Sequence, residues 1–113
     1  MRIVDQVAAW CVVVLGLGHS IWTARFPEMN LNALWFLSGG LFLMVVGALN
    51  LLRVRYVSAS GVRWVCVASN VAALAFVLAI AHLISLRANP QAIVALVAVA
   101  LLTIFSLRRP ERA

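Results

Sequence analysis

The chain has 113 residues, of which 65% are hydrophobic and only 11% are charged, and its formal net charge is +6. Its mean hydropathy is +1.09. A soluble domain is typically about half apolar and about a quarter charged. This composition excludes an ordinary water-soluble domain and favours a protein whose solvent is lipid.

Four apolar stretches divide the chain. A membrane-spanning helix needs roughly 20 apolar residues, and the sequence predicts helices at about 3–23, 30–52, 62–86 and 90–107. The predicted fold class is all-α, an integral membrane four-helix bundle that forms one transmembrane domain, 1–113. Because the connections are short, we expect consecutive helices to run up-down-up-down.

The loops carry start signals for two of these helices. Pro27-Glu28 is a candidate start for the second helix, because Glu in a first turn complements the helix dipole. Asn89-Pro90 predicts the start of the fourth helix, with Asn89 as N-cap and Pro90 at a position where proline loses no intrahelical hydrogen bond.

The arginines predict an orientation. All nine basic residues are arginine, and they stand at the ends of the predicted helices. Cytoplasmic loops of membrane proteins carry the excess of basic residues. Arg25 and Arg87 would lie on the outer side. The others would lie on the cytoplasmic side with both termini: Arg2, the loop residues Arg53, Arg55 and Arg63, and the tail residues Arg108, Arg109 and Arg112.

This basic inner surface predicts a lipid partner. Arginine near a membrane surface attracts anionic headgroups at about 1 kcal/mol per residue. Since the charges stand at helix ends and not on one basic face, we expect anionic lipid and no nucleic acid as partner. Arginine to the exclusion of lysine, with abundant Ala, Val and Gly, is typical of GC-rich bacterial genomes, so we expect a multi-pass protein of the bacterial inner membrane.

The two cysteines are predicted to stay unpaired. Cys11 would lie about 13 Å above Arg2, whereas Cys66 would lie about 5 Å above Arg63. Such a difference in depth is too large for a disulfide, and we expect both side chains to pack between helices.

His19 and His82 are the candidate ligand-binding residues. Each would lie roughly 8 to 9 Å inside the outer boundary marked by Arg25 and Arg87. The first and third helices are diagonal partners in such a bundle, so these imidazoles would face each other across its axis. Imidazole is a common ligand of haem iron and metals, and an opposed pair would suit a six-coordinate haem b.

A structural role for the histidines stays open beside the haem hypothesis. Each imidazole would then bond to a neighbouring helix, with Ser20, Ser38 and Ser85 available near that depth. We expect no cofactor and no metal, with haem b held by His19 and His82 as the alternative. Laying His19 over His82 also lays Pro27 over Pro90, which suggests that the chain is two related helical hairpins.

Small and amide residues are predicted to pack the helices. Gly40, Gly47 and Asn50 share one face of the second helix, where two glycines let another backbone approach closely. Asn50 and Asn70 lie toward the cytoplasmic side, where we expect them to bond between the second and third helices. The glycines would serve packing within one chain or between subunits, and we favour packing within one chain.

The sequence gives no catalytic set. No membrane-embedded pair of acids, no Ser-His-Asp or Cys-His set and no glycine-rich phosphate loop is evident. In size and helix count the chain resembles the small multidrug-resistance exporters, whose mechanism uses a buried Glu in the first helix. This chain has Trp10, Cys11 and Val12 there, so it lacks the residue that carries that mechanism.

The predicted function is that of a small polytopic membrane protein without catalysis of its own. It would act as an accessory subunit, a scaffold or a small-ligand binder, as a homo-oligomer or within a larger membrane complex. Two alternatives remain: an electron carrier with haem b on His19 and His82, and a small oligomeric transporter in which these histidines are proton-linked.

Overall fold

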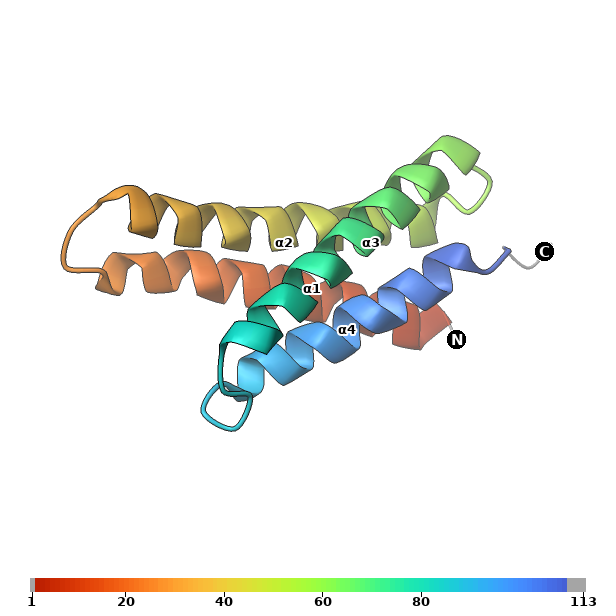
Figure 1. Cartoon of the computed structure of the whole chain (residues 1–113). Coiled ribbons are helices and arrows are strands. Elements are labelled where there is room, and N and C mark those ends of the chain that lie inside the picture. The colour runs from red at the N-terminus through yellow and green to blue at the C-terminus, as the bar shows by residue number, and fades with distance from the viewer. Residues whose placement is uncertain (1, 110–113) are drawn as a thin grey trace.

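The computed structural model describes residues 2–109. In this part of the chain all regular structure is helical, and consecutive long helices run antiparallel (Figure 1). Each of the four long helices is apolar enough to cross a membrane. They are α1 (Arg2–Trp22), α2 (Leu31–Arg55), α3 (Ser60–Leu83) and α4 (Pro90–Leu107), with a short 3₁₀ helix η1 (Thr23–Arg25) after α1.

The bundle has two ends of different character (Figure 1). One end, here called the termini end, holds Arg2, the 56–59 connection and Arg109, and the other, the hairpin end, holds the loops 26–30 and 84–89. The α1–α2 and α3–α4 pairs form two hairpins. The hairpins meet near the termini end and diverge toward the hairpin end, so contact between them is concentrated in one half of the molecule (Figure 1).

The starts of α2 and α4 differ from the sequence prediction in detail. Pro27-Glu28 lies in the loop, and α2 begins at Leu31 because the Asn30 side chain accepts a hydrogen bond from the Ala33 amide at 3.0 Å. An N-cap of this kind satisfies one of the free amides of a first turn. Pro90 does open α4, but the Asn89 side chain donates to the Ser85 carbonyl at 2.9 Å and makes no cap.

The middle connection is shorter than predicted. The α2 helix continues to Arg55 and α3 begins at Ser60, so Arg53, Arg55 and Arg63 are helical residues and not loop residues. Basic residues in the last turn of a helix complement its dipole, which favours this extension. At its other end α3 stops at Leu83, because the chain reverses through residues 84–89 before Pro90.

Glycines bring α1 and α2 together. A Cβ atom added to Gly47 would lie 2.8 Å from the Ala9 carbonyl oxygen, and one added to Gly16 would lie 2.6 Å from the Gly40 carbonyl oxygen. No side chain fits in that space, so only glycine permits the two backbones to approach so closely. The predicted packing residues Gly40 and Gly47 thus face α1 within the same chain.

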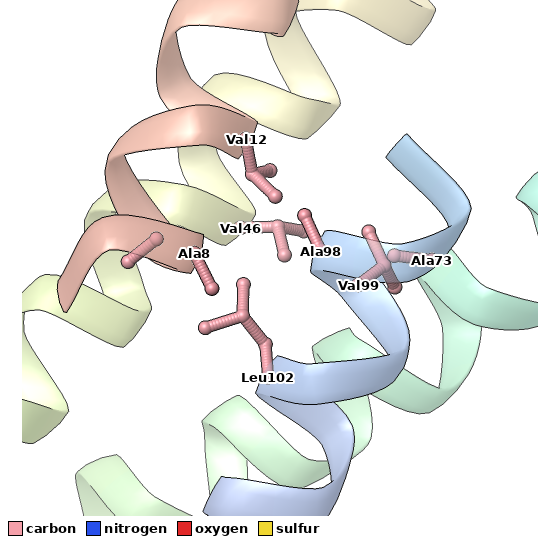
Figure 2. Close-up of a cluster of buried hydrophobic side chains, with 8 residues drawn as sticks. Ala8, Val12, Val46, Ala73, Ala98, Val99 and Leu102 are labelled. Carbon is pink, nitrogen blue, oxygen red and sulfur yellow. The ribbon is translucent and has the colours of Figure 1, made fainter. Parts of the chain in front are cut away.

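The hydrophobic core lies where the two hairpins meet. All four helices contribute residues to this core, and α4 contributes its largest fully buried side chain, Leu102 (Figure 2). Its other members are small or β-branched, which lets the helices pack closely. The cluster consists of Ala8, Ala9, Val12, Val46, Ala73, Ala98, Val99 and Leu102.

Candidate functional site

A salt bridge joins the start of α1 to the end of α2. The Arg53 guanidinium donates to both carboxylate oxygens of Asp5, through Nη2 at 2.6 Å and Nη1 at 3.0 Å. The two side chains are only 11% and 12% exposed. A two-pronged contact of this kind fixes the geometry as well as the charge, and Asp5 also lies in the first turn of α1, where the helix dipole favours an anion.

The same arginine connects this salt bridge to the amide of Asn50, one turn earlier on α2. Arg53 Nε and Nη2 donate to Asn50 Oδ1 at 3.2 and 3.1 Å. The amide nitrogen of Asn50 donates to the Val46 carbonyl at 2.8 Å. Since a guanidinium only donates and a carbonyl only accepts, these neighbours fix which end of the amide is oxygen.

Asn50 and Asn70 form a reciprocal pair of hydrogen bonds between the hairpins. Asn50 Nδ2 donates to Asn70 Oδ1 at 2.7 Å, and Asn70 Nδ2 donates to Asn50 Oδ1 at 3.0 Å. Both side chains are fully buried. The bond that the sequence led us to expect between the second and third helices is therefore present.

Asn70 extends the network to the fourth helix. Its amide nitrogen is 3.1 Å from the Leu102 carbonyl and 3.2 Å from the Ser106 hydroxyl. Ser106 in turn donates to the Thr103 carbonyl at 2.9 Å. A chain of polar contacts therefore runs from α1 through α2 and α3 to α4, here called the polar network: Asp5, Arg53, Asn50, Asn70 and Ser106.

Two further contacts lie at the same end, one within the second hairpin and one between the hairpins. Arg63 on α3 donates to the Ser106 and Leu107 carbonyls at 3.1 and 3.0 Å, which satisfies carbonyls that the last turn of α4 leaves free. Cys66 Sγ lies 3.1 Å from the Leu49 carbonyl. Cys11 and Cys66 are both free thiols, as predicted.

The polar network is internally complete. Among residues 2–109, every buried side-chain nitrogen or oxygen has a hydrogen-bond partner. In a low-dielectric interior an unpaired polar group is costly. The members of the network therefore satisfy one another's hydrogen-bonding groups, and this arrangement is suited to joining helices.

The structure does not bring His19 and His82 together. The His19 ring lies within the first hairpin, stacked on Phe36 with a centroid distance of 3.6 Å. His82 is exposed in the last turn of α3. In the described part of the chain α1 and α3 do not pack against each other, as expected for diagonal helices, and the hairpins diverge at this end (Figure 1).

The serines near the histidines bond within their own helices. Ser20 donates to the Gly16 carbonyl at 2.8 Å and Ser38 to the Trp35 carbonyl at 2.7 Å. Over residues 2–109 no group of three or more His, Cys, Asp or Glu side chains is arranged to hold a metal ion.

Sequence reasoning missed the contribution of Asp5, Arg53 and Ser106. Arg53 was expected to face lipid headgroups together with Arg63, but both guanidinium groups make internal contacts. Arg112 of the same predicted surface lies outside the described residues. One signal could have found the salt bridge: Asp5 is the single acid inside a predicted span, and an anion there needs a cationic partner.

Comparison of the chain with protein-family models, curated proteins and solved structures finds no match.

Removal of one member of the Asp5–Arg53 pair should lower the free energy of unfolding more than removal of both members. Asp5→Leu leaves a mostly buried guanidinium without its counter-ion, so we expect a loss of about 3 kcal/mol in the free energy of unfolding. The double variant Asp5→Leu/Arg53→Met should recover most of this loss, because two apolar side chains replace the charges. Reversible unfolding in mixed micelles measures both values.

Glu28→Gln is the matched control, since it removes an exposed acid from the 26–30 loop, and it should change stability by less than about 0.5 kcal/mol. If Asp5→Leu also changes the free energy of unfolding by less than about 0.5 kcal/mol, that result would contradict the assigned role of the salt bridge.

Proposed function

We propose that the chain is an integral protein of the bacterial inner membrane, with its termini end on the cytoplasmic side. In this proposal it has no catalytic activity and serves as an accessory subunit or scaffold, alone as a homo-oligomer or within a larger membrane complex. The observation that carries the proposal is the closed polar network, whose charged and amide groups bond one another across all four helices.

Helix length and boundary residues support the membrane placement. The 21 residues of α1 span about 31 Å, close to the roughly 30 Å of a hydrocarbon core. Aromatic rings at both boundaries carry arginines above their faces, Arg25 over Trp22 at the hairpin end and Arg63 over Trp64 at the termini end. Amphipathic aromatic rings are favoured at the membrane interface.

The distribution of side chains supports a non-catalytic role. The polar side chains buried within the bundle act as donors and acceptors to other helices or to their own backbone. Large apolar side chains cover the outward faces of the helices, for example Trp10, Phe42 and Phe76. Such a surface suits contact with lipid and with other membrane helices.

Cysteine labelling in whole cells tests the orientation. Met29→Cys lies in the 26–30 loop and Ser58→Cys in the 56–59 connection, and both positions are exposed. In a background without Cys11 and Cys66, a membrane-impermeant maleimide should label Met29→Cys in intact cells and Ser58→Cys only after lysis. The reverse pattern would contradict the proposed orientation.

Gentle solubilisation of native membranes tests the accessory role. We expect the chain to migrate in an assembly of fixed stoichiometry, and the purified chain to show neither a Soret band nor pH-dependent flux in liposomes. A Soret band that disappears in His19→Ala and His82→Ala would replace this proposal with the haem alternative. Flux that the same variants abolish would replace it with the transporter alternative.

A further inference from the structure

An apolar groove runs along the outside of the bundle between α1 and α4. It consists of two adjoining hollows of about 390 and 300 Å³, both lined by Val7, Cys11 and Val94. The hollow nearer the hairpin end reaches Val14 on α1, and the one nearer the termini end reaches Val4. The walls are almost wholly apolar, so the groove offers an occupant no hydrogen bonds.

Small side chains create the groove. Ala8 on α1 and Ala98 on α4 line the hollow nearer the termini end, and both also belong to the buried core (Figure 2). Because a methyl group fills little space, the alanines form the floor of the groove and the larger valines on either side form its walls. From Val4 to Val14 the groove is about 15 Å long, which is half of a roughly 30 Å hydrocarbon core. Its length therefore matches one leaflet.

Arginines mark one end of this groove. Arg2 is the first residue of α1, and Arg108 and Arg109 follow the last residue of α4. All three are exposed, Arg108 with its guanidinium over the Phe105 ring, whereas Arg53 and Arg63 donate hydrogen bonds within the bundle. Long arginine side chains extend along apolar surface while their heads reach the interface. A ligand with an apolar chain and an anionic head would match both the groove and its charged end.

We propose that the groove binds one acyl chain of an anionic phospholipid of the cytoplasmic leaflet, with the phosphate against Arg2, Arg108 and Arg109. This inference rests on the proposed membrane placement and orientation. The lipid would fill the hollow between the two hairpins and add a contact between α1 and α4. It would thereby act as a structural component of the bundle.

Native mass spectrometry of the purified chain with defined lipids tests the headgroup contact. With phosphatidylglycerol we expect one lipid retained per chain, and weaker retention of phosphatidylcholine with the same acyl chains. Arg2→Gln and Arg108→Gln should each weaken phosphatidylglycerol binding about fivefold. The controls Arg25→Gln and Arg87→Gln, at the hairpin end, should leave it unchanged.

A second pair of variants tests the acyl-chain contact. Val94→Trp fills the groove, whereas Val71→Trp adds the same bulk on α3, and the two valines are similarly exposed, at 48% and 50%. Val94→Trp should abolish the retained lipid and Val71→Trp should preserve it.

Equal retention of both lipids, unchanged by Val94→Trp, would indicate ordinary surrounding lipid and overturn the proposal. A dimer that Val94→Trp dissociates would overturn it in favour of a second copy of the chain. Either result would leave the proposed function and its labelling test standing, so the lipid site and the proposed function fail separately.

Discussion

The reciprocal amide pair between Asn50 and Asn70 is the constraint on which the rest of the structure depends. Each amide sits inside a long apolar helix, where no solvent would replace a missing hydrogen bond. The two amides satisfy each other, and they also fix the neighbouring groups on both sides: Arg53 on α2 and Ser106 on α4. The depth and rotation of both hairpins therefore follow from this contact.

The helices are joined by close packing and by directional polar contacts, both within the hairpins and between them. Within the first hairpin, glycines allow close backbone packing, and the Asp5–Arg53 salt bridge adds a directional contact. Between the hairpins, the apolar core is supplemented by the Asn50–Asn70 amide pair and by the contact of Cys66 with the Leu49 carbonyl. Lipid chains are as apolar as helix surfaces, so shape and hydrogen bonding decide how helices associate in a membrane. The polar contacts between the hairpins lie toward the termini end, where the hairpins meet (Figure 1).

The sequence predicted those parts of the fold that follow from local pattern. Four helices were predicted from the length of the apolar stretches, and the Asn50–Asn70 contact from two amides toward the same end of neighbouring helices. The Asp5–Arg53 pair was not, because α2 was expected to end before Arg53. The proximity of His19 and His82 was inferred from their common depth and from the diagonal placement of the first and third helices. Depth does not fix the lateral distance between helices, and His19 stacks on Phe36 within its own hairpin.

The coupling energy between Asn50 and Asn70 tests the role of the amide pair most directly. It is obtained from a double-mutant cycle with Asn50→Ala and Asn70→Ala, in which reversible unfolding in mixed micelles gives the free energy of unfolding of each variant. Ser69 supplies the reference cycle with Asn50, because its hydroxyl donates to the Val65 carbonyl of its own helix. We expect a coupling of about 0.6 to 1.7 kcal/mol for Asn50 with Asn70, and additive effects for Asn50 with Ser69. Additive effects for both pairs, within about 0.5 kcal/mol, would contradict the claim that the amide pair holds the hairpins together.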